Sequence, residues 1–181
     1  MSRTARTRAH IQQTALDLFE QQGFEATTVA EVAAAASVSH MTVFRHFATK
    51  EALVVEDLFD AAIGDAVAAQ PTDLPPLRRA VAGFRSALDG LDADASAEVR
   101  RRVRIVALTP SLRAASAAAS TASQGAVAAA LTDGDAAPLD AQVAAAAVVA
   151  GLGEALLAWA LTDDDLREHL DRALDVLDGA R

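Results

Sequence analysis

The sequence predicts an all-α protein of about nine helices, divided into a three-helix N-terminal domain and a larger helical C-terminal domain. Alanine makes up about a quarter of the 181 residues, and alanine favours the helix more than any other residue. Apolar residues recur at helical spacing along most of the chain, and no segment alternates as a half-buried strand does. A chain of this length suits one ordinary domain or two small ones.

Charge divides the chain at about residue 50. The whole sequence has 16 basic and 25 acidic residues, a formal net charge of −9 that argues against a nucleic-acid partner. Residues 1–50, however, contain five basic and four acidic residues, so their net charge is +1 and the remainder carries −10. We therefore expect the two parts to have different partners.

The sequence contains no cysteine, which excludes disulfides, thiolate metal sites and cysteine nucleophiles. This composition fits a reducing cytoplasm, where we expect the protein to be. No apolar segment follows the basic N-terminus, so we expect no secretory signal. The longest apolar stretch, residues 143–161, is interrupted by Glu154, which favours a buried helix and no membrane partner.

The first helix is predicted over residues 8–22. Its apolar face has the i, i+4, i+7, i+8 spacing of a helix, in Ile11, Ala15, Leu18 and Phe19. Gly23 follows where a C-cap glycine belongs. We expect a flexible basic arm before this helix, able to add backbone or minor-groove contacts with Arg3, Arg6 and Arg8.

Two short helices follow, joined by a tight turn at residues 37–38. The second helix starts at Thr28, because Thr28 and Glu31 have the spacing of a capping box. Ser39 is the expected N-cap of a third helix over residues 40–47.

The rest of the chain is also predicted to be helical. Thr49 caps a long fourth helix that ends near residue 69, before several prolines. A connector is expected over residues 89–96. Further helices are predicted from residue 77 and over residues 97–108, 110–131, 138–161 and 163–177.

Two helices joined by a tight turn form a helix-turn-helix, which places its second helix in the major groove of DNA. The expected base contacts come from residues 40–47, through His40, Met41, Thr42 and Arg45. The expected phosphate contacts come from Thr28, Ser39, Thr42, His46 and Lys50.

An ordered string of residues runs through this region. It consists of Ile11, Ala15, Leu18, Phe19, Gly23, Phe24, Thr27, Thr28, Val29, Val32, Ala33, Val38, Ser39, Thr42, Val43, Phe44, His46, Phe47, Lys50, Glu51, Ala52 and Leu53. With this string, residues 9–53 resemble the N-terminal domain of the TetR family of bacterial transcriptional regulators. Single elements of the string are weak signals, but the whole string in order is specific. It covers about a quarter of the chain, and the remainder is generic in sequence.

The resemblance implies a homodimer that binds a palindromic operator in double-stranded DNA, usually as a repressor. Residues 1–48 would read DNA, and residues 49–181 would dimerise and sense an unidentified small-molecule effector. In such proteins the last two long helices form a four-helix bundle across the dimer, here residues 138–161 and 163–177. Effector binding changes the spacing of the two DNA-reading domains and releases the DNA.

Two residues depart from the family pattern. Ser37 occupies a turn position that usually holds glycine, and a left-handed conformation there would cost about 1 kcal/mol relative to glycine. Phe44 stands where tyrosine is usual, so it keeps the ring packing of a DNA-contacting residue without a hydroxyl for phosphate.

The effector site is the least specified part of the sequence. The candidate pocket residues are Phe84, Leu88, Val103, Arg104 and Leu108, of which the apolar ones also suit an ordinary core. The arginines at 100, 101, 102 and 104 cannot share one helix face, because each residue turns the helix by 100°. Either they form a solvated face that pairs with the excess acid, or Arg104 and Arg113 recognise an anionic effector.

The four histidines show no catalytic spacing with serine or carboxylate residues, and no glycine-rich phosphate loop occurs. We therefore expect no catalytic residue, no enzyme activity and no cofactor. Asp165 and His169 have a metal-compatible spacing, but the acidic run 163–165 at a helix start favours capping over a metal site. The alternatives to a DNA-binding regulator are a helical protein-interaction module and a small-molecule enzyme or carrier.

Overall fold

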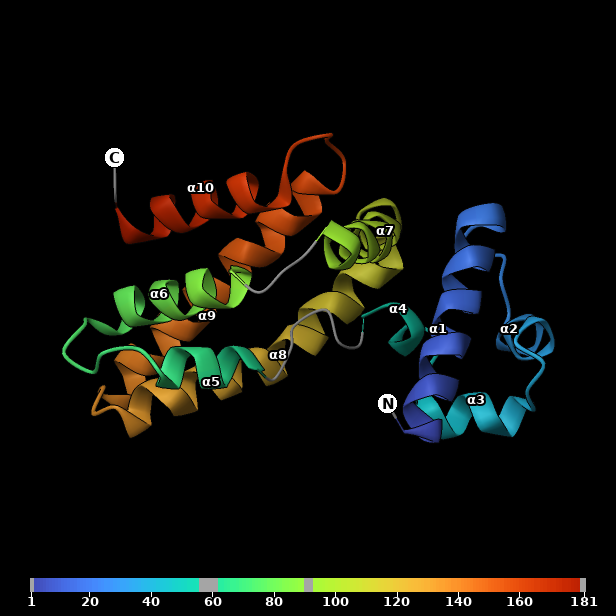
Figure 1. Ribbon diagram of the computed structural model, residues 1–181, viewed down its shortest axis with the longest axis horizontal. Helices are drawn as coiled ribbons and strands as arrows, with labels where there is room; N and C mark the ends of the chain where they lie inside the picture. The colour runs from blue at the N-terminus through green and yellow to red at the C-terminus, as the bar shows by residue number, and fades with distance from the viewer. Residues whose placement is uncertain (1, 56–61, 90–92, 180–181) are drawn as a thin grey trace.

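The computed structural model describes residues 2–55, 62–89 and 93–179. Ten helices lie within these residues, which confirms the all-α class. They form two parts in Figure 1: a head of residues 2–55, in blue to teal, and a body of residues 62–179, in green to red.

The head contains α1 (Arg3–Gln22), α2 (Val29–Ala35), α3 (His40–His46) and α4 (Ala52–Val55). Gly23 ends α1 with a φ of 87°, and its N–H donates to the Phe19 carbonyl at 3.0 Å. This is the predicted C-cap. The positive φ explains the glycine, since other L residues rarely adopt it.

The expectation of a flexible basic arm is wrong, because Arg3, Arg6 and Arg8 lie within α1. The Ser2 hydroxyl accepts the Ala5 N–H at 3.1 Å and caps the helix five residues earlier than predicted. Arginine and alanine are strong helix formers, so this segment extends the helix without an apolar stripe of its own.

The body contains α5 (Ala62–Ala68), α6 (Pro76–Leu88), α7 (Ala93–Leu108), α8 (Pro110–Asp133), α9 (Pro138–Trp159) and α10 (Leu166–Asp178). Proline opens α6, α8 and α9, where its missing N–H removes no intrahelical bond. Because α7 begins at Ala93, the connector predicted over residues 89–96 is wrong from residue 93 onward. Alanines and Glu98 favour the helix there without apolar periodicity.

The long fourth helix predicted over residues 49–69 is described only near its ends, as α4 and α5. The Ala52 N–H donates to the Thr49 hydroxyl at 3.2 Å, which confirms the predicted cap. Residues 56–61, the middle of this prediction, lie outside the described residues.

Two hydrophobic clusters correspond to the two parts. The head cluster contains side chains from all four head helices and from the turns between them, and its large members include Ile11, Phe19, Phe24, Phe47 and Leu53. It also takes in Ile105 and Val106 of α7 and Leu112 of α8, so the corner between these helices joins the head to the body. Helix α4, which follows the predicted boundary at residue 48, also packs in the head cluster.

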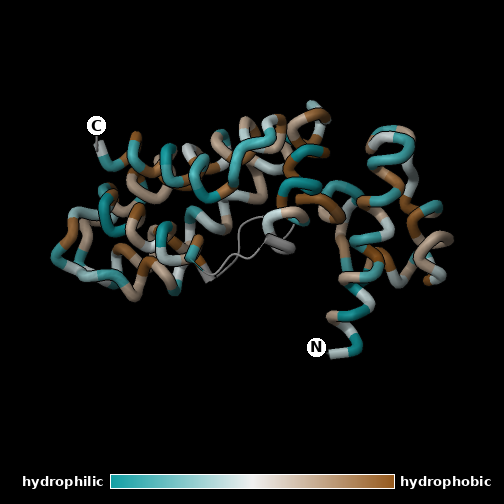
Figure 2. The backbone as a smooth tube through the Cα atoms, turned by 45° about the horizontal axis from the view of Figure 1, so that its top comes forward, coloured by the Kyte–Doolittle hydropathy of each residue, from teal (hydrophilic) through white to brown (hydrophobic). Residues whose placement is uncertain are grey.

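Helix α9 runs through the body and packs against α6, α8 and α10 (Figure 1). Within the described part of the chain, α9 is the helix that is long and apolar enough to cross a membrane. Its buried residues, such as Val148 and Leu152, belong to the body cluster. Figure 2 shows hydrophobic and hydrophilic residues alternating around the neighbouring helices, as expected for helices with one face in a core.

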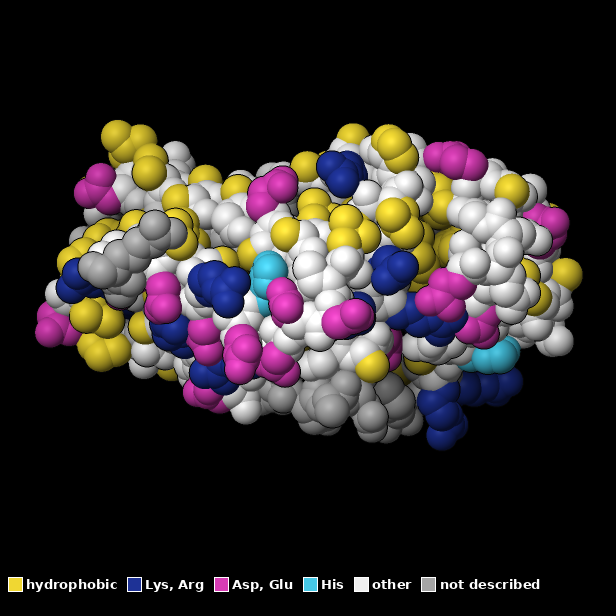
Figure 3. Space-filling model, turned by 90° about the horizontal axis from the view of Figure 1, so that it is seen from above, with side chains coloured by type: hydrophobic (Ala, Val, Ile, Leu, Met, Phe, Trp, Pro, Cys, Tyr) yellow, Lys and Arg dark blue, Asp and Glu magenta, His cyan; other side chains and the backbone are white. Residues whose placement is uncertain are grey.

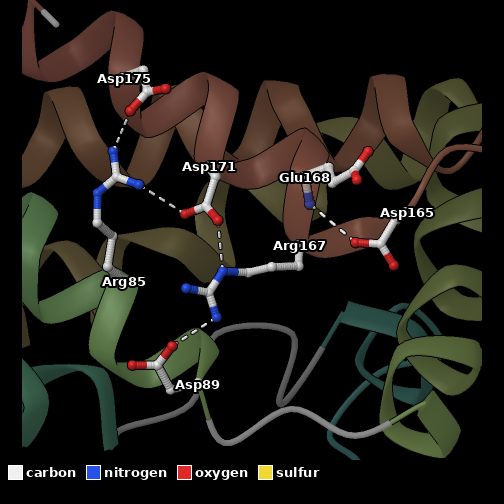
Figure 4. Close-up of polar contacts among 7 residues, drawn as sticks. All are labelled: Arg85, Asp89, Asp165, Arg167, Glu168, Asp171 and Asp175. Atoms are coloured by element: carbon white, nitrogen blue, oxygen red, sulfur yellow. Dashed lines mark hydrogen bonds and ion pairs between the residues drawn. The ribbon is translucent and has the colours of Figure 1, made fainter.

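Ion pairs fasten α10 to α6 (Figure 4). Arg85 of α6 pairs with Asp171 at 2.8 Å and with Asp175. Arg167 pairs with Asp171 and with Asp89, both at 2.7 Å, and these contacts raise the pKa of Arg167, with Asp171 the larger cause. Figure 3 shows acidic and basic side chains intermixed on this side of the body. The paired charges therefore hold α10 in register with α6.

Candidate nucleic-acid interface and ligand cavity

The helix caps and the tight turn predicted for α2 and α3 are present in the structure. The Thr28 hydroxyl accepts the Glu31 N–H at 3.2 Å, and the Glu31 carboxylate accepts the Thr28 N–H at 2.7 Å, which completes the capping box. Ser37 has a φ of 55°, so the left-handed conformation foreseen at this position is present. Ser39 caps α3 by accepting the Thr42 N–H at 3.1 Å.

Helix α3 separates its buried side from an exposed arc. Val43 and Phe47 point into the head cluster, while His40, Met41, Phe44 and Arg45 are exposed. At 100° per residue, these four exposed positions fall within about 140° of the helix circumference. Met41 is 74% exposed and Phe44 is 43% exposed, although burial of such side chains is ordinarily favourable. The exposed arc of α3 therefore presents a mixed apolar and polar surface.

Two rings stand together on the exposed arc. His40 and Phe44 lie one helical turn apart with ring centroids 4.7 Å from each other in an edge-to-face arrangement. This contact restricts the rotamers of both side chains. Phe44 thus retains the ring packing expected for this position.

The side chains predicted to contact phosphate occupy the edges of the same unit. The hydroxyls of Ser39 and Thr42 are hydrogen-bonded to each other at 2.8 Å, and the Thr28 hydroxyl donates to Glu31 at 2.8 Å. The Thr28 and Ser39 hydroxyls therefore serve as helix caps, and the Thr42 hydroxyl bonds one of them. Lys50 places its Nζ 4.1 Å from the centre of the Phe24 ring.

Arg8 fixes the end of α3 to α1. Its Nη1 donates to the His46 carbonyl at 2.6 Å, and its guanidinium lies 4.3 Å from the centre of the Phe47 ring. Sequence reasoning placed Arg8 on the arm. The i, i+3 and i+7 spacing of Arg8 with Ile11 and Ala15 was the available signal that it belongs to the same helix.

The arginines of α7 leave the helix on different faces, and most hold the structure together. Arg100 stacks over Trp159 at 4.1 Å and donates to the carbonyls of Thr162 and Asp164. Arg101 pairs with Asp17 and with Glu20 of α1, and these contacts raise its pKa, with the Glu20 hydrogen bond the largest cause.

Arg102 and Arg104 complete this set. Arg102 is buried and donates to the Val54 carbonyl of α4 at 2.9 Å. Arg104 is exposed. Thus Arg101 and Arg102 both connect α7 to the head, which neither interpretation of the sequence foresaw.

The predicted effector residues do not share one pocket. Val103 lines a cavity of about 250 Å³ between α7, α8 and α9. Phe84 is buried in the body cluster, and Leu88 packs at its edge. Arg104 and Leu108 line a separate cleft between α7 and the head. The helical stripe was visible in the sequence, but the neighbour that each face meets was not.

Polar side chains of α8 form one wall of the cavity. They are Arg113, Ser116, Ser120 and Gln124, opposite Glu154 of α9. Their spacing of three or four residues along an otherwise alanine-rich helix marks one face. That spacing was the signal that could have found them. The floor is apolar and includes Val103, Val149 and Leu156.

Apolar side chains are also exposed on the outer face of α9 and on α10. Val143 is 60% exposed, and Leu139 and Val176 are exposed to a similar degree. Gly151 faces inward instead, because a Cβ there would lie 3.2 Å from Leu177 of the same chain.

Asp165 is the N-cap of α10, where its carboxylate accepts the Glu168 N–H at 3.1 Å (Figure 4). A cap within the acidic run is therefore present at Asp165.

Two family patterns match the chain. Residues 11–56 match the bacterial regulatory proteins of the tetR family, and residues 74–180 match the MftR C-terminal domain. The second match covers more than half of the chain and includes the helices that line the cavity.

Curated relatives match parts of the chain. The HTH-type transcriptional regulator TcmR of Streptomyces glaucescens is 39% identical over 116 residues, 60% of this chain and 51% of that protein. The HTH-type transcriptional repressor Rv3405c of Mycobacterium tuberculosis is 50% identical over 46 residues, 25% of this chain and 24% of that protein. The chain thus matches about half the length of TcmR and less of Rv3405c.

Solved structures share the fold across nearly the whole chain. FadR of Thermus thermophilus, a TetR family repressor solved with lauroyl-CoA, is 22% identical with a TM-score of 0.56, over 94% of this chain and 92% of that one. FadR of Bacillus halodurans is 18% identical with a TM-score of 0.61, over 96% and 95%. At these identities the likeness concerns the fold alone.

Proposed function

The chain belongs to the TetR family of bacterial regulatory proteins, and on this premise we propose that it is a ligand-responsive repressor that binds a palindromic operator as a homodimer. This role places it in the cytoplasm, with the bacterial chromosome. The proposal has three parts: DNA reading by the head, dimerisation through α9 and α10, and effector binding in the body.

The exposed arc of α3 is the observation that carries the proposal. Arg45 offers a bidentate donor for guanine, His40 a donor or acceptor, and Met41 an apolar contact for a thymine methyl group. Phe44 holds His40 in place through the ring contact at 4.7 Å. The side chains around this arc would bind phosphate, namely Thr28, Ser39, Thr42, His46 and Lys50.

Dimerisation through α9 and α10 accounts for the exposed apolar side chains there. Leu139, Val143 and Val176 would be covered by the same surface of a second copy, as a two-fold interface requires. The ion pairs that hold α10 on α6 would orient this surface.

The cavity of about 250 Å³ is the proposed effector site. Its apolar floor and polar α8 wall favour a small molecule with an apolar body and a hydrogen-bonding edge. FadR structures with lauroyl-CoA and stearoyl-CoA show that proteins of this fold bind such molecules. Val103 and Val106 reach the cavity from α7, while Arg101 and Arg102 of the same helix hold the head. A shift of α7 on effector binding would therefore move the head.

Selection of bound fragments from random duplex DNA, followed by footprinting, tests DNA reading. We expect a palindromic site whose affinity falls steeply as salt rises, because phosphate contacts release counterions. Replacing both His40 and Arg45 with alanine should remove about 1–3 kcal/mol of sequence preference for each lost base contact. Arg78→Ala, on the body, is the matched control and should leave the preference unchanged. Unchanged preference in the double variant would refute the assigned readers.

A further inference from the structure

A buried guanidinium that forms no ion pair within the described residues lies near the start of α6, at the end of the body opposite the head (Figure 1). Arg79 is 3% exposed, and its Nη2 donates to the Ala68 carbonyl at 3.2 Å. Its Nε and Nη1 have no hydrogen-bond partner. None of the ion pairs in the described residues involves Arg79.

The position of this guanidinium is closely specified. A Cβ on Gly134 would lie 1.6 Å from Nη1 of Arg79, so the side chain occupies the space that a larger residue would fill. Gly134 is the C-cap of α8, and Ala68 ends α5. The carboxyl ends of two helices thus meet at Arg79.

The local protein groups compensate this charge only in part. Helix carboxyl ends carry partial negative charge, which favours a cation. An arginine nevertheless has five N–H donors and stays ionised in proteins, and a buried ion without a partner is strongly unfavourable. One hydrogen bond to Ala68 therefore leaves most of the donor capacity unused. A bound water or ion is one explanation for buried polar atoms that are left without partners in this way.

A cavity of about 150 Å³ lies directly beside Arg79. Its walls include the apolar side chains of Leu74, Leu131 and Ala136 and the polar side chains of Thr72 and Asp135. A water molecule takes roughly 30 Å³ of liquid volume, so the space suits a ligand of only a few heavy atoms. The cavity combines one cationic wall with a short apolar wall.

We propose that this cavity binds a short-chain monocarboxylate. Its carboxylate lies beside the Arg79 guanidinium, and its alkyl tail packs on Leu74, Leu131 and Ala136. Arginine favours carboxylates because its planar donors match their geometry. Asp135 also lines the cavity and repels negative charge, which disfavours doubly charged anions such as phosphate.

The ligand would act on the connection between α8 and α9. Gly134, Asp135 and Ala136 belong to the turn that joins these helices, and α9 begins at Pro138. Occupancy would stabilise the body against unfolding, because a ligand that binds the folded chain alone shifts the equilibrium toward it. This site is separate from the proposed effector cavity, and the proposal holds whether or not the head reads DNA.

Thermal unfolding of the full chain in sodium butyrate, against sodium chloride at equal ionic strength and pH, tests the site. We expect a saturable rise in the unfolding temperature of the wild type. Arg79→Met keeps an apolar stem without the charge and should weaken butyrate binding about tenfold or more. Arg78→Met is the matched control, since Arg78 is exposed and pairs with Asp178, and it should keep the response.

Two further variants separate the explanations. Ala136→Leu fills the apolar wall without touching the guanidinium and should also abolish the response, which keeps the test decisive if Arg79→Met does not fold. Asp135→Asn should retain the butyrate response and extend it to phosphate. An unresponsive wild type, or an equal response in Arg79→Met or Ala136→Leu, would overturn the proposal. An adventitious salt effect would raise the unfolding temperature equally in the wild type, Arg79→Met and Ala136→Leu.

Discussion

The head and the body are both helical, but they fill their interiors differently. The head packs large side chains, including Phe19, Phe24 and Phe47, into a small core. The body cluster contains more buried alanines, at 80, 130, 141, 144, 145 and 160, beside valines, leucines and two aromatic residues. Large side chains packed around α3 hold it in one position in the head.

Small residues in the body allow neighbouring helices to lie close together. A Cβ on Gly83 of α6 would lie 2.7 Å from the Cα of Val67 in α5, so only glycine allows these helices their present distance. The same alanine-rich body nevertheless leaves about 250 Å³ open between α7, α8 and α9. The cavity is therefore a local feature of the α8 and α9 faces and not of loose packing throughout.

The largest effect should come from the head core. Phe47→Ala removes a buried ring and should lower the free energy of unfolding by about 3–5 kcal/mol. Val149→Ala, at the cavity wall of the body, should cost less because its side chain already faces open space. Chemical denaturation of both variants measures this. Phe44→Ala, on the exposed arc, is the control and should change stability by no more than about 0.5 kcal/mol. Equal losses at Phe47 and Val149 would remove the contrast between the two interiors.

The joint between the two parts should be the next most sensitive place. Arg102→Met removes both buried hydrogen bonds from the guanidinium to the Val54 carbonyl, which should cost about 1–3 kcal/mol. Arg104→Met, on the exposed side of the same helix, should stay within about 0.5 kcal/mol of the wild type. Denaturant unfolding compares them. If the two variants behave alike, α7 does not hold the head in the way described.

A smaller gain is expected at the turn of the helix-turn-helix. Ser37 has a φ of 55°, a conformation that glycine adopts without steric cost. Ser37→Gly should therefore raise the free energy of unfolding by about 1 kcal/mol. Ser39→Gly serves as the contrasting variant, because it removes a cap and should destabilise the protein. Thermal unfolding that showed a loss for Ser37→Gly would contradict the strain assigned to this turn.

The smallest effect concerns acid. Hydrogen bonds from the Thr28 backbone, and then from its hydroxyl, lower the pKa of Glu31 below 4.5. The unfolded chain therefore takes up this proton first as the pH falls, so the stabilisation is present above pH 4.5 and is lost below it. In Glu31→Gln, the stability of the head should fall slightly less steeply as the pH drops below 4.5. Helical circular dichroism during unfolding at each pH measures this. Glu25→Gln, on the exposed α1–α2 turn, is the comparison variant, and an identical acid limb in wild type and Glu31→Gln would contradict the assignment.

The sequence by itself determined where most helices begin and end. Thr28, Ser39, Thr49 and Asp165 are caps in the structure because a cap acts on the backbone of the next few residues, a range that the sequence makes visible. The ordered string in the head likewise identified the family, since a small core restricts the side chain at each position.

The tertiary structure decided which neighbour each face meets. Helical periodicity shows that Arg101, Arg102 and Val103 leave α7 in different directions, but not that they reach α1, α4 and the cavity. Periodicity likewise does not distinguish Arg79 from any other helical arginine. Only the structure shows that the ends of α5 and α8 enclose it. These contacts join residues more than ten positions apart, and the physical reason is that long-range packing depends on the positions of several helices at once.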